Sequence, residues 1–218
     1  LDMERLGRAG AGAQVLAGHA WGLTRVVVSP DGKLLATASR DGTAKVWDLA
    51  TGAVVRTLAG TEPVLSIVWA PDGNSLVTCN GTQGANDGFV HLWDAATGTK
   101  RKSLKFGSTV NEIAFSPDGK RLAVATEKNG ASLWQPDGSA QIAMLGDAGD
   151  TAGEVEISAD GALVLVRAGK EVRVHATGDG ALVATLAGHE KGILDAAFSR
   201  SGAQVATASI DGTVRVWD

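Results

Sequence analysis

One stretch of roughly forty residues recurs along the chain, and this repetition constrains the fold more than any local feature. The first copy runs from Leu16-Ala-Gly-His19 to Asp41-Gly-Thr-Ala-Lys-Val-Trp-Asp48, and the last runs from Leu186-Ala-Gly-His189 to Asp211-Gly-Thr-Val-Arg-Val-Trp-Asp218. The five copies begin at Leu16, Leu58, Leu104, Leu145 and Leu186, so the steps between them are 42, 46, 41 and 41 residues by subtraction. A repeat of this size predicts a series of similar supersecondary units.

Each repeat divides into four short predicted strands separated by turn signals. In the first repeat the strands cover residues 23–28, 34–39, 44–48 and 54–57, and the turns are Pro30-Asp-Gly32, Asp41-Gly42 and Thr51-Gly52. The first of these turns returns at 71–73, 117–119, 159–161 and 200–202. Short strands at this spacing predict an all-β protein of four-stranded antiparallel blades arranged radially.

A period in the low forties, with Gly-His near its start and Trp-Asp near its end, resembles the WD-repeat family of β-propellers. The resemblance covers residues 12–218 and implies a five-repeat propeller. Residues 1–11 show no strand alternation, and we interpret them as a linker or lead-in. The tryptophan of the third strand is present in four repeats and is replaced by His175 in the fourth.

The two ends of the chain match each other. Residues 12–15 precede Leu16 as residues 54–57 precede Leu58, so they resemble the last strand of a repeat, whereas the fifth repeat stops after its third strand. Since rings of this family close with strands from both ends, we predict that residues 12–15 pair with residues 214–217 in a closed five-bladed ring. The alternative is an arc of a larger ring, with uncovered apolar end faces. The chain does not start with Met, so we expect a piece of a longer protein.

Composition and the absence of known motifs exclude several classes of function from our expectations. The net charge is −4 and no Lys/Arg run is longer than the three residues 100–102, so nucleic acid is not an expected partner. No apolar run approaches about 18 residues, so we expect no membrane insertion. A lone cysteine, Cys79, fits a reducing compartment, and we expect a cytoplasmic location. The chain shows no phosphate loop, zinc spacing or paired-carboxylate motif, so we expect no cofactor, no metal site and no enzymatic activity.

The resemblance also implies a buried hydrogen-bond network in each well-matched repeat. It joins the Gly-His histidine, a second-strand hydroxyl, a turn aspartate and the third-strand tryptophan. The two complete sets are His19, Ser39, Asp41 and Trp47, and His189, Ser209, Asp211 and Trp217. His, Ser and Asp together also suggest a hydrolase triad. Because the set recurs at one repeat phase, we interpret it as structural and expect no catalytic residue.

Recognition is the remaining function, and we expect a noncatalytic interaction scaffold that binds a protein, a peptide or another domain of the same longer chain. In the family, partners bind the face formed by the loops between fourth and first strands and between second and third strands. The candidate contact residues there are Trp21, Arg40, Gln83, Asn86, Glu127, Lys191 and Ile210. The long loop 80–86 either projects and contacts a partner or is an insertion that the fold tolerates without using it. Trp21 either anchors an interface or packs under its loop. The alternatives are a sensor or regulatory domain of a bacterial signalling or defence protein, and an enzyme that uses the propeller face.

Overall fold

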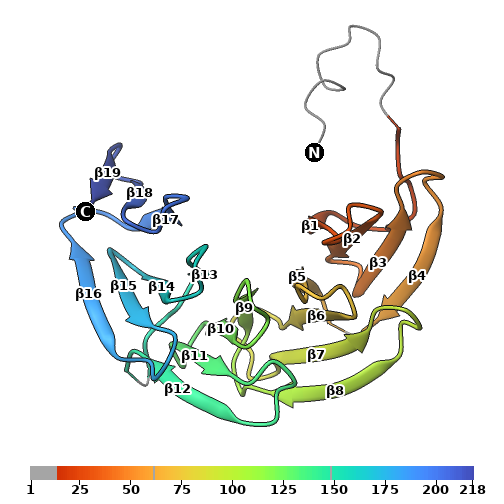
Figure 1. Cartoon of the computed structure of the whole chain (residues 1–218), viewed down its shortest axis with the longest axis horizontal. Helices are drawn as coiled ribbons and strands as arrows, with labels where there is room; N and C mark the ends of the chain where they lie inside the picture. Colours follow the sequence, from red (N-terminus) through yellow and green to blue (C-terminus); the bar gives the residue numbers. More distant parts are fainter. Residues whose placement is uncertain (1–13, 61, 148) are drawn as a thin grey trace, which may run out of the picture.

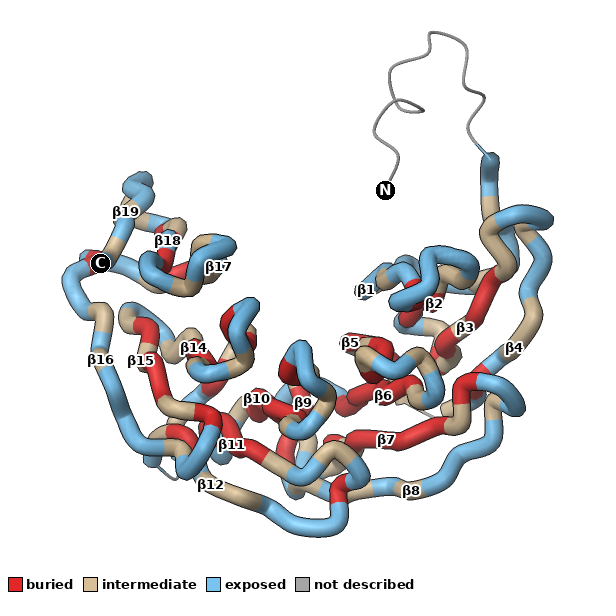
Figure 2. The backbone as a smooth tube through the Cα atoms, in the orientation of Figure 1, coloured by how far each residue is buried: buried red, intermediate tan, exposed pale blue. Residues whose placement is uncertain are grey.

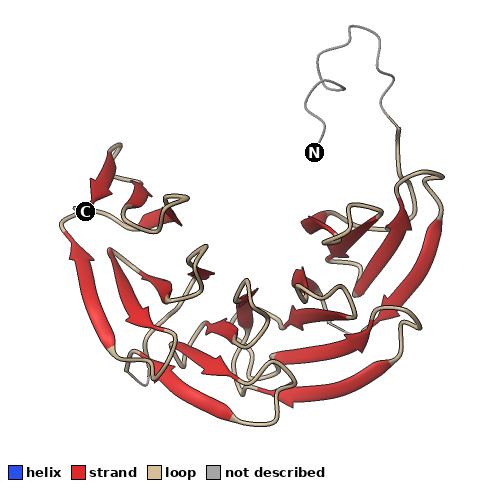
Figure 3. Cartoon of the chain, in the orientation of Figure 1, coloured by secondary structure: helices blue, strands red, loops and turns tan. Residues whose placement is uncertain are grey.

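The computed structural model describes residues 14–60, 62–147 and 149–218, and every regular element in these ranges is a strand (Figure 3). The strands form five antiparallel sheets, one for each repeat. Blade 1 contains β1 (Leu23–Val28), β2 (Leu34–Ser39), β3 (Thr43–Asp48) and β4 (Val54–Ala59); blade 2 contains β5 (Val64–Trp69), β6 (Ser75–Asn80), β7 (Phe89–Asp94) and β8 (Lys100–Lys105). Blade 3 contains β9 (Val110–Phe115), β10 (Leu122–Thr126), β11 (Ala131–Trp134) and β12 (Gln141–Leu145); blade 4 contains β13 (Glu154–Ile157), β14 (Leu163–Ala168), β15 (Glu171–Ala176) and β16 (Leu182–Ala187); blade 5 contains β17 (Ile193–Phe198), β18 (Val205–Ser209) and β19 (Val214–Trp217).

The predicted all-β blade architecture is confirmed. Strands within a blade are neighbours in chain order, and the first strands β1, β5, β9, β13 and β17 line the concave side (Figure 1). The turns between first and second strands use glycine at positive φ, as at Gly32 with φ 71°. An L-residue with a Cβ rarely adopts this backbone conformation, which explains the repeated Asp-Gly signal.

The five blades form an open arc, so the prediction of a closed ring is wrong (Figure 1). Among the described residues, β19 pairs only with β18, and Gln14 and Val15 lie in no strand. Gly12, Ala13 and the expected linker 1–11 lie outside the described residues. The angle between neighbouring blades is set by the side chains packed between them, and four such junctions do not bring blade 5 to blade 1.

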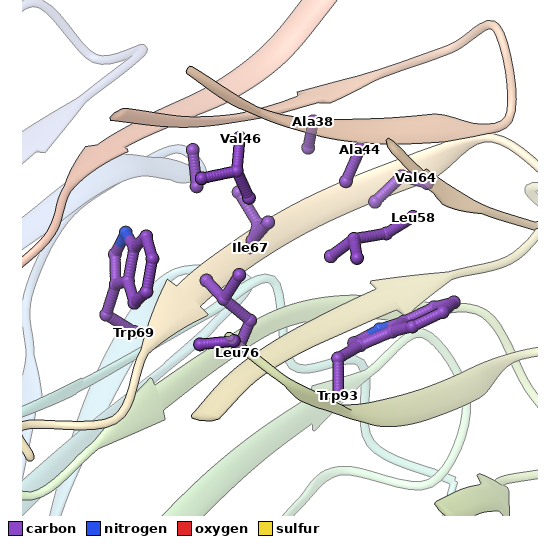
Figure 4. Packing of buried hydrophobic residues seen from close by; sticks show 11 residues of the cluster. Ala38, Ala44, Val46, Leu58, Val64, Ile67, Trp69, Leu76 and Trp93 are labelled. Carbon is purple, nitrogen blue, oxygen red and sulfur yellow. The ribbon is translucent and has the colours of Figure 1, made fainter. Parts of the chain in front are cut away.

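Each junction packs apolar side chains of one blade against apolar side chains of the blade before it. Between blades 1 and 2, Ile67 and Trp69 of β5 share one cluster with Ala38 of β2 and Val46 of β3 (Figure 4). Ala36 of β2 belongs to the same cluster. Ile67, Ala36, Ala38 and Val46 are all 0% exposed. Three further apolar clusters occupy the junctions 2–3, 3–4 and 4–5, so burial runs through the middle of the arc (Figure 2).

The leucines that begin the second, third and fourth repeats each lie against a glycine turn of the following blade. A Cβ at Gly98 would lie 3.4 Å from Leu58 Cδ2, and one at Gly138 would lie 2.7 Å from Leu104 Cδ1. The same relation holds at the start of the arc, where a Cβ at Gly52 would lie 3.1 Å from Leu16 Cδ2 and would collide with the Gln14 amide. Gln14 and Leu16 therefore occupy, beside blade 1, the position that the outer strand of a preceding blade would occupy.

Val46 and Val216 test the junction packing, because they hold equivalent positions in β3 and β19. Val46 is fully buried under blade 2, whereas Val216 is 63% exposed. Val46→Ala should lower the free energy of unfolding by about 2 kcal/mol through lost burial and a cavity, and Val216→Ala by about 0.5 kcal/mol or less. Urea unfolding of dilute protein measures both, and equal losses would contradict an uncovered fifth blade.

Candidate interaction surface

A buried hydrogen-bond network supports the loops of blade 1. The Nδ1 atom of His19 lies 2.9 Å from Asp41 Oδ2, and its Nε2 atom lies 2.8 Å from Thr37 Oγ1. Trp47 Nε1 donates to the same Thr37 hydroxyl at 2.8 Å. A histidine that carries its proton on Nδ1 matches every donor with an acceptor: Trp47 to Thr37, Thr37 to His19, and His19 to Asp41.

Blade 5 repeats this network atom for atom. His189 lies 2.8 Å from both Asp211 Oδ2 and Thr207 Oγ1, and Trp217 Nε1 donates to Thr207 Oγ1 at 3.0 Å. The side chain of His189 is fully buried and that of Asp211 is 6% exposed. Two remote parts of the sequence thus build one arrangement.

The second-strand hydroxyl of the network is a threonine, so the assignment of Ser39 and Ser209 to this position is wrong. Trp47 pairs with Leu35 across β2 and β3, and its indole therefore reaches Thr37, two residues along the same face. Ser39 lies beyond Ala38, the last residue of β2 paired with β3. The sequence carries the missed signal twice, as Thr37-Ala-Ser39 and Thr207-Ala-Ser209.

The two serines instead fix the loops. Ser39 Oγ donates to the carbonyl oxygens of Trp21 at 3.1 Å and Gly22 at 3.2 Å, and accepts from the Asp41 N–H. Ser209 makes the equivalent bonds to Lys191 and Gly192. In both blades the serine hydroxyl bonds backbone rather than histidine, which is not the arrangement of a hydrolase triad.

The turn aspartates are held ionised. Burial of Asp41 opposes its charge, but hydrogen bonds from Thr43, the Ala20 N–H and His19 outweigh this effect and lower the pKa of the carboxyl well below 3.8. For Asp211, the hydrogen bond from Thr213 is the largest cause of the lowered pKa. Each carboxylate thus stabilises the folded state at pH values above 3.8, and this stabilisation is lost as the pH falls below that value.

The middle blades keep only parts of the network. Trp93 Nε1 donates to Thr78 Oγ1 at 2.9 Å in blade 2, whereas Trp134 Nε1 in blade 3 donates to Ser132 Oγ. In blade 4, His175 stands in the tryptophan position, and its Nδ1 bonds the Gly180 carbonyl at 3.0 Å. Its Nε2 atom is buried without a partner. Apolar packing from both neighbouring blades therefore holds these blades together.

The candidate contact residues fall into three groups on one face. This upper face is formed by residues 16–22, 40–42, 80–88, 127–129, 188–192 and 210–212. Trp21 lies beside Arg40, since the Arg40 N–H donates to Gly22 O at 3.1 Å. Lys191 lies beside Ile210 through the matching bond from the Ile210 N–H to Gly192 O at 3.0 Å. Trp21 is 71% exposed and so is not packed under its loop.

The third group joins blades 2 and 3 through the long loop 80–88. Glu127 accepts a hydrogen bond from the Gly84 N–H at 2.8 Å, and Lys128 Nζ donates to Gly84 O at 2.8 Å and to Asn86 Oδ1 at 3.4 Å. Thr109 Oγ1 donates to Thr82 O at 2.7 Å. The loop is thus fixed on blade 3 rather than projecting as a free finger, and the side chain of Gln83 is exposed on it.

The concave wall carries ionisable side chains that no sequence motif indicated. Arg25 of β1 pairs with Glu112 of β9 at 2.9 Å, and Arg167 of β14 pairs with Glu154 of β13 at 2.9 Å. Burial outweighs the attraction of Arg25 and raises the pKa of Glu112 to about 7. Burial also raises the pKa of Glu154 and of Glu156. The only sequence signal is a polar residue at the same position of successive first strands, which is visible once the register is known.

Two kinds of site were sought in the residues that the structure describes. No group of three or more His, Cys, Asp or Glu side chains there is placed to hold a metal ion. No helix in those same ranges is long and apolar enough to cross a membrane.

Comparison with known proteins relates four segments of the chain to one family. The family model "WD domain, G-beta repeat" matches residues 12–48, 52–94, 98–135 and 180–218. The longest segment that it does not match, 136–179, contains most of blade 4, in which His175 replaces the tryptophan.

The similar curated proteins match over parts of the chain. An uncharacterized WD repeat-containing protein of Synechocystis sp. is 35% identical over 36% of this chain and 23% of its own length. The target of rapamycin complex subunit wat1 of Schizosaccharomyces pombe is 38% identical over 29% of this chain and 20% of its own length. A WD repeat-containing protein 26 homolog of Arabidopsis thaliana is 33% identical over 33% of this chain and 13% of its own length. The chain thus spans less than a quarter of the length of these relatives.

Thr207 tests the corrected network. Thr207→Val removes the hydroxyl between His189 and Trp217 and leaves the buried His189 Nε2 and the partly buried Trp217 Nε1 unpaired, so it should lower the free energy of unfolding by about 2 kcal/mol. Thr207→Ser keeps the hydroxyl and should cost about half as much or less. Denaturant unfolding compares them, and equal losses for the two variants would show that the hydroxyl is not the connecting group.

Glu112 predicts the direction in which the free energy of unfolding changes with pH. Between pH 4.5 and 7 the folded protein retains a proton on Glu112 that the unfolded chain releases, so the free energy of unfolding should fall by about 2 kcal/mol as the pH rises through this window. Glu112→Gln should reduce that fall, leaving the part due to Glu154 and Glu156. Urea unfolding between pH 4.5 and 7.5 measures the slope, with Glu190→Gln as an exposed control. An unchanged slope in Glu112→Gln would refute the assignment.

Proposed function

Because the chain belongs to the WD40 repeat family, we propose that it is a noncatalytic module that binds a protein or peptide partner on its upper face. Repeats of this family generally mediate protein–protein interaction. The finer proposal is that the contact is made by Trp21 and Arg40 on blade 1, by Lys191 and Ile210 on blade 5, and by the loop carrying Gln83 and Asn86, with Glu127, between them.

The observation that carries this proposal is that blades 1 and 5 hold their loops with the same hydrogen bonds but expose different side chains on them. Blades 1 and 5 hold their loops with equivalent hydrogen bonds from Ser39 and Ser209. On that frame blade 1 presents an aromatic and a cationic side chain, whereas blade 5 presents a cationic and an aliphatic one. Trp21 and Ile210 are 71% and 57% exposed. A rigid frame lowers the entropy lost on binding, and exposed aromatic and arginine side chains are frequent interface anchors.

The proposal that the module is noncatalytic rests on the hydrogen bonds of the histidines and aspartates in blades 1 and 5. His19 and Asp41, and the equivalent residues of blade 5, use their polar atoms in a hydrogen-bond network that ends at a tryptophan indole. None of the curated relatives named above carries an enzyme's name. One is called a complex subunit, which is a statement about that protein alone.

The setting of the module is also a proposal. We infer a cytoplasmic, bacterial protein in which this arc acts within a longer chain, where its partner is another protein or a further domain. The buried, unpaired Cys79 and the cyanobacterial relative support this inference. The net charge of −4 favours a protein over a nucleic acid as partner. Affinity capture with the intact gene product identifies that partner.

The upper face predicts a separation of binding from stability. Trp21→Ala and Arg40→Glu should each weaken binding of the captured partner by tenfold or more, since an anchor residue contributes about 2 kcal/mol. The melting temperature should stay within about 2 °C of the parent, because both side chains are exposed. Titration calorimetry and thermal unfolding measure the two quantities.

The matched controls lie on the opposite face, at the turns that carry Lys33 and Lys120. Lys33→Glu and Lys120→Glu should leave the affinity unchanged. Affinity lost in these controls and kept in the Trp21 and Arg40 variants would move the binding site to that face and refute the proposal.

A further inference from the structure

The turn that joins β11 to β12 in blade 3 differs from the equivalent turns of blades 1, 2 and 4. In those blades the second residue after the tryptophan position donates its N–H to the turn between the first two strands: Leu49 to Lys33 O at 3.0 Å, Ala95 to Asn74 O at 3.0 Å and Thr177 to Ala162 O at 2.9 Å. In blade 3 this residue is Pro136, which has no N–H to donate. The turn is also shorter, since only residues 135–137 separate Trp134 from Gly138, whereas residues 94–97 separate Trp93 from Gly98.

A cavity of about 510 Å³ lies beside this turn, at the junction of blades 2 and 3. It opens on the lower face, which is the face opposite the upper face. Its lining includes both turns of blade 3 that the missing bond leaves unconnected, at residues 118–119 and 136–137, together with residues 70–72 of blade 2 and part of β8. Blades 2 and 3 each have a neighbour on both sides, so this lower cavity belongs to the interior of the arc and not to one of its ends. Its volume falls in the range of roughly 300–1,000 Å³ that is usual for ligand pockets.

Part of the lining is apolar. Leu92 of β7 and Phe115 of β9 contribute to it, as do Pro71 and Pro136 of the two turns. Burial of an apolar ligand side chain against these groups is favourable, because it removes apolar surface of both partners from water.

Two of the charged side chains in the lining neutralise each other. Lys102 Nζ donates to Gly138 O at 2.8 Å, which places the ammonium group beside Asp137. A hydrogen bond from Ser139 is the main cause of the lowered pKa of Asp137, and the charge of Lys102 lowers it further. This pair therefore holds the short turn against β8 and leaves other charges for a ligand.

Arg101 can bind a ligand carboxylate. Its guanidinium group pairs with Asp94 and donates to Ser75 Oγ at 3.3 Å. A guanidinium carries five N–H donors, so these contacts do not exhaust it. The Arg101 side chain is 51% exposed, and it lines the lower cavity together with Ser75.

Asp118 can bind a ligand cation. Hydrogen bonds from Ser116 and from the Lys120 N–H lower the pKa of Asp118, so its carboxyl is ionised at neutral pH. Both of these bonds end on Oδ1, and the other oxygen has only the exposed Lys120 ammonium at 3.5 Å, an ion pair of little strength. Asp72, by contrast, uses both of its carboxylate oxygens for Asn74.

We propose that the lower cavity binds an extended peptide segment in which an acidic and a basic side chain flank an apolar one. The acidic side chain pairs with Arg101, the basic one pairs with Asp118, and the apolar one packs against Leu92 and Phe115. A ligand with charges of only one sign places a like charge beside Arg101 or Asp118, and this repulsion selects the dipolar segment. The site lies on the face opposite Trp21 and does not depend on the proposed function.

Synthetic peptides with blocked ends test the charge requirement. Acetyl-Glu-Leu-Lys-amide and acetyl-Lys-Leu-Glu-amide carry both charges in the two possible orders. The controls are the Glu-Leu-Glu, Lys-Leu-Lys and Gln-Leu-Gln peptides with the same blocked ends. Titration calorimetry at low salt should show one dipolar peptide binding about tenfold tighter than every control. Equal binding of a control, or no binding of either dipolar peptide at millimolar concentration, would overturn the proposal.

A matched pair of variants then places the site. Asp118→Asn keeps the Oδ1 atom that holds the turn but removes the charge, so it should weaken binding of the dipolar peptide about tenfold and leave the melting temperature within about 2 °C of the parent. Asp160→Asn makes the same change in blade 4, where Oδ1 also accepts from a serine and from the N–H two residues later, and it should leave the affinity unchanged. Arg101→Gln should act like Asp118→Asn. Equal affinities for the Asp118 and Asp160 variants would refute the assignment.

Repair of the turn tests the cavity itself. Pro136→Ala with one alanine inserted after it gives blade 3 the turn length of blade 2 and supplies the missing N–H to Lys120 O. This variant should fill the lower cavity and abolish peptide binding without lowering the melting temperature. Binding that survives the repair in a folded variant would also overturn the proposal, and the Asp118 and Arg101 variants decide the question independently of this one.

Discussion

The structure depends on one kind of contact, the packing of the apolar face of each blade onto the apolar face of the preceding blade. At the first junction Ile67 and Trp69 share one cluster with Ala36 and Ala38, and the other three junctions follow the same register with different residues. Since each blade alone leaves both of its apolar faces exposed to water, much of the stability comes from the contacts between blades. This explains how blade 4 persists with a histidine in the tryptophan position.

The hydrogen-bond network fixes the loops at the upper face, next to the apolar junctions between blades. In blades 1 and 5 it connects an indole, a threonine, a histidine and an aspartate, and the adjacent serine holds the neighbouring loop. The network thus links the buried junction to the exposed backbone that carries Trp21 or Ile210. In the middle blades other contacts take this role, as when Glu127 and Lys128 hold Gly84 of the loop before them.

Most of the fold could be predicted because it is local and repeated. Strand alternation and Asp-Gly turns identify each strand of the first repeat to within a residue or two. The errors concern geometry that no single repeat contains. Thr37 and Ser39 both offer a hydroxyl, and only the cross-strand position of Trp47 decides between them. Whether the ends meet depends on the angle at each junction, which is set by the sizes of side chains from distant parts of the chain. The fixed loop 80–88 likewise depends on residues of the next blade.

Four of the five leucines that begin a repeat lie against a glycine turn. This contact points in the same direction along the arc at each of the four. Leu16, Leu58, Leu104 and Leu145 all face forward along the chain, each onto the turn of the blade that follows. The internal boundaries therefore share this contact, although the apolar side chains packed between the blades differ from one boundary to the next. Duplication or loss of one whole repeat would change the span and curvature of the arc while leaving its two terminal surfaces the same.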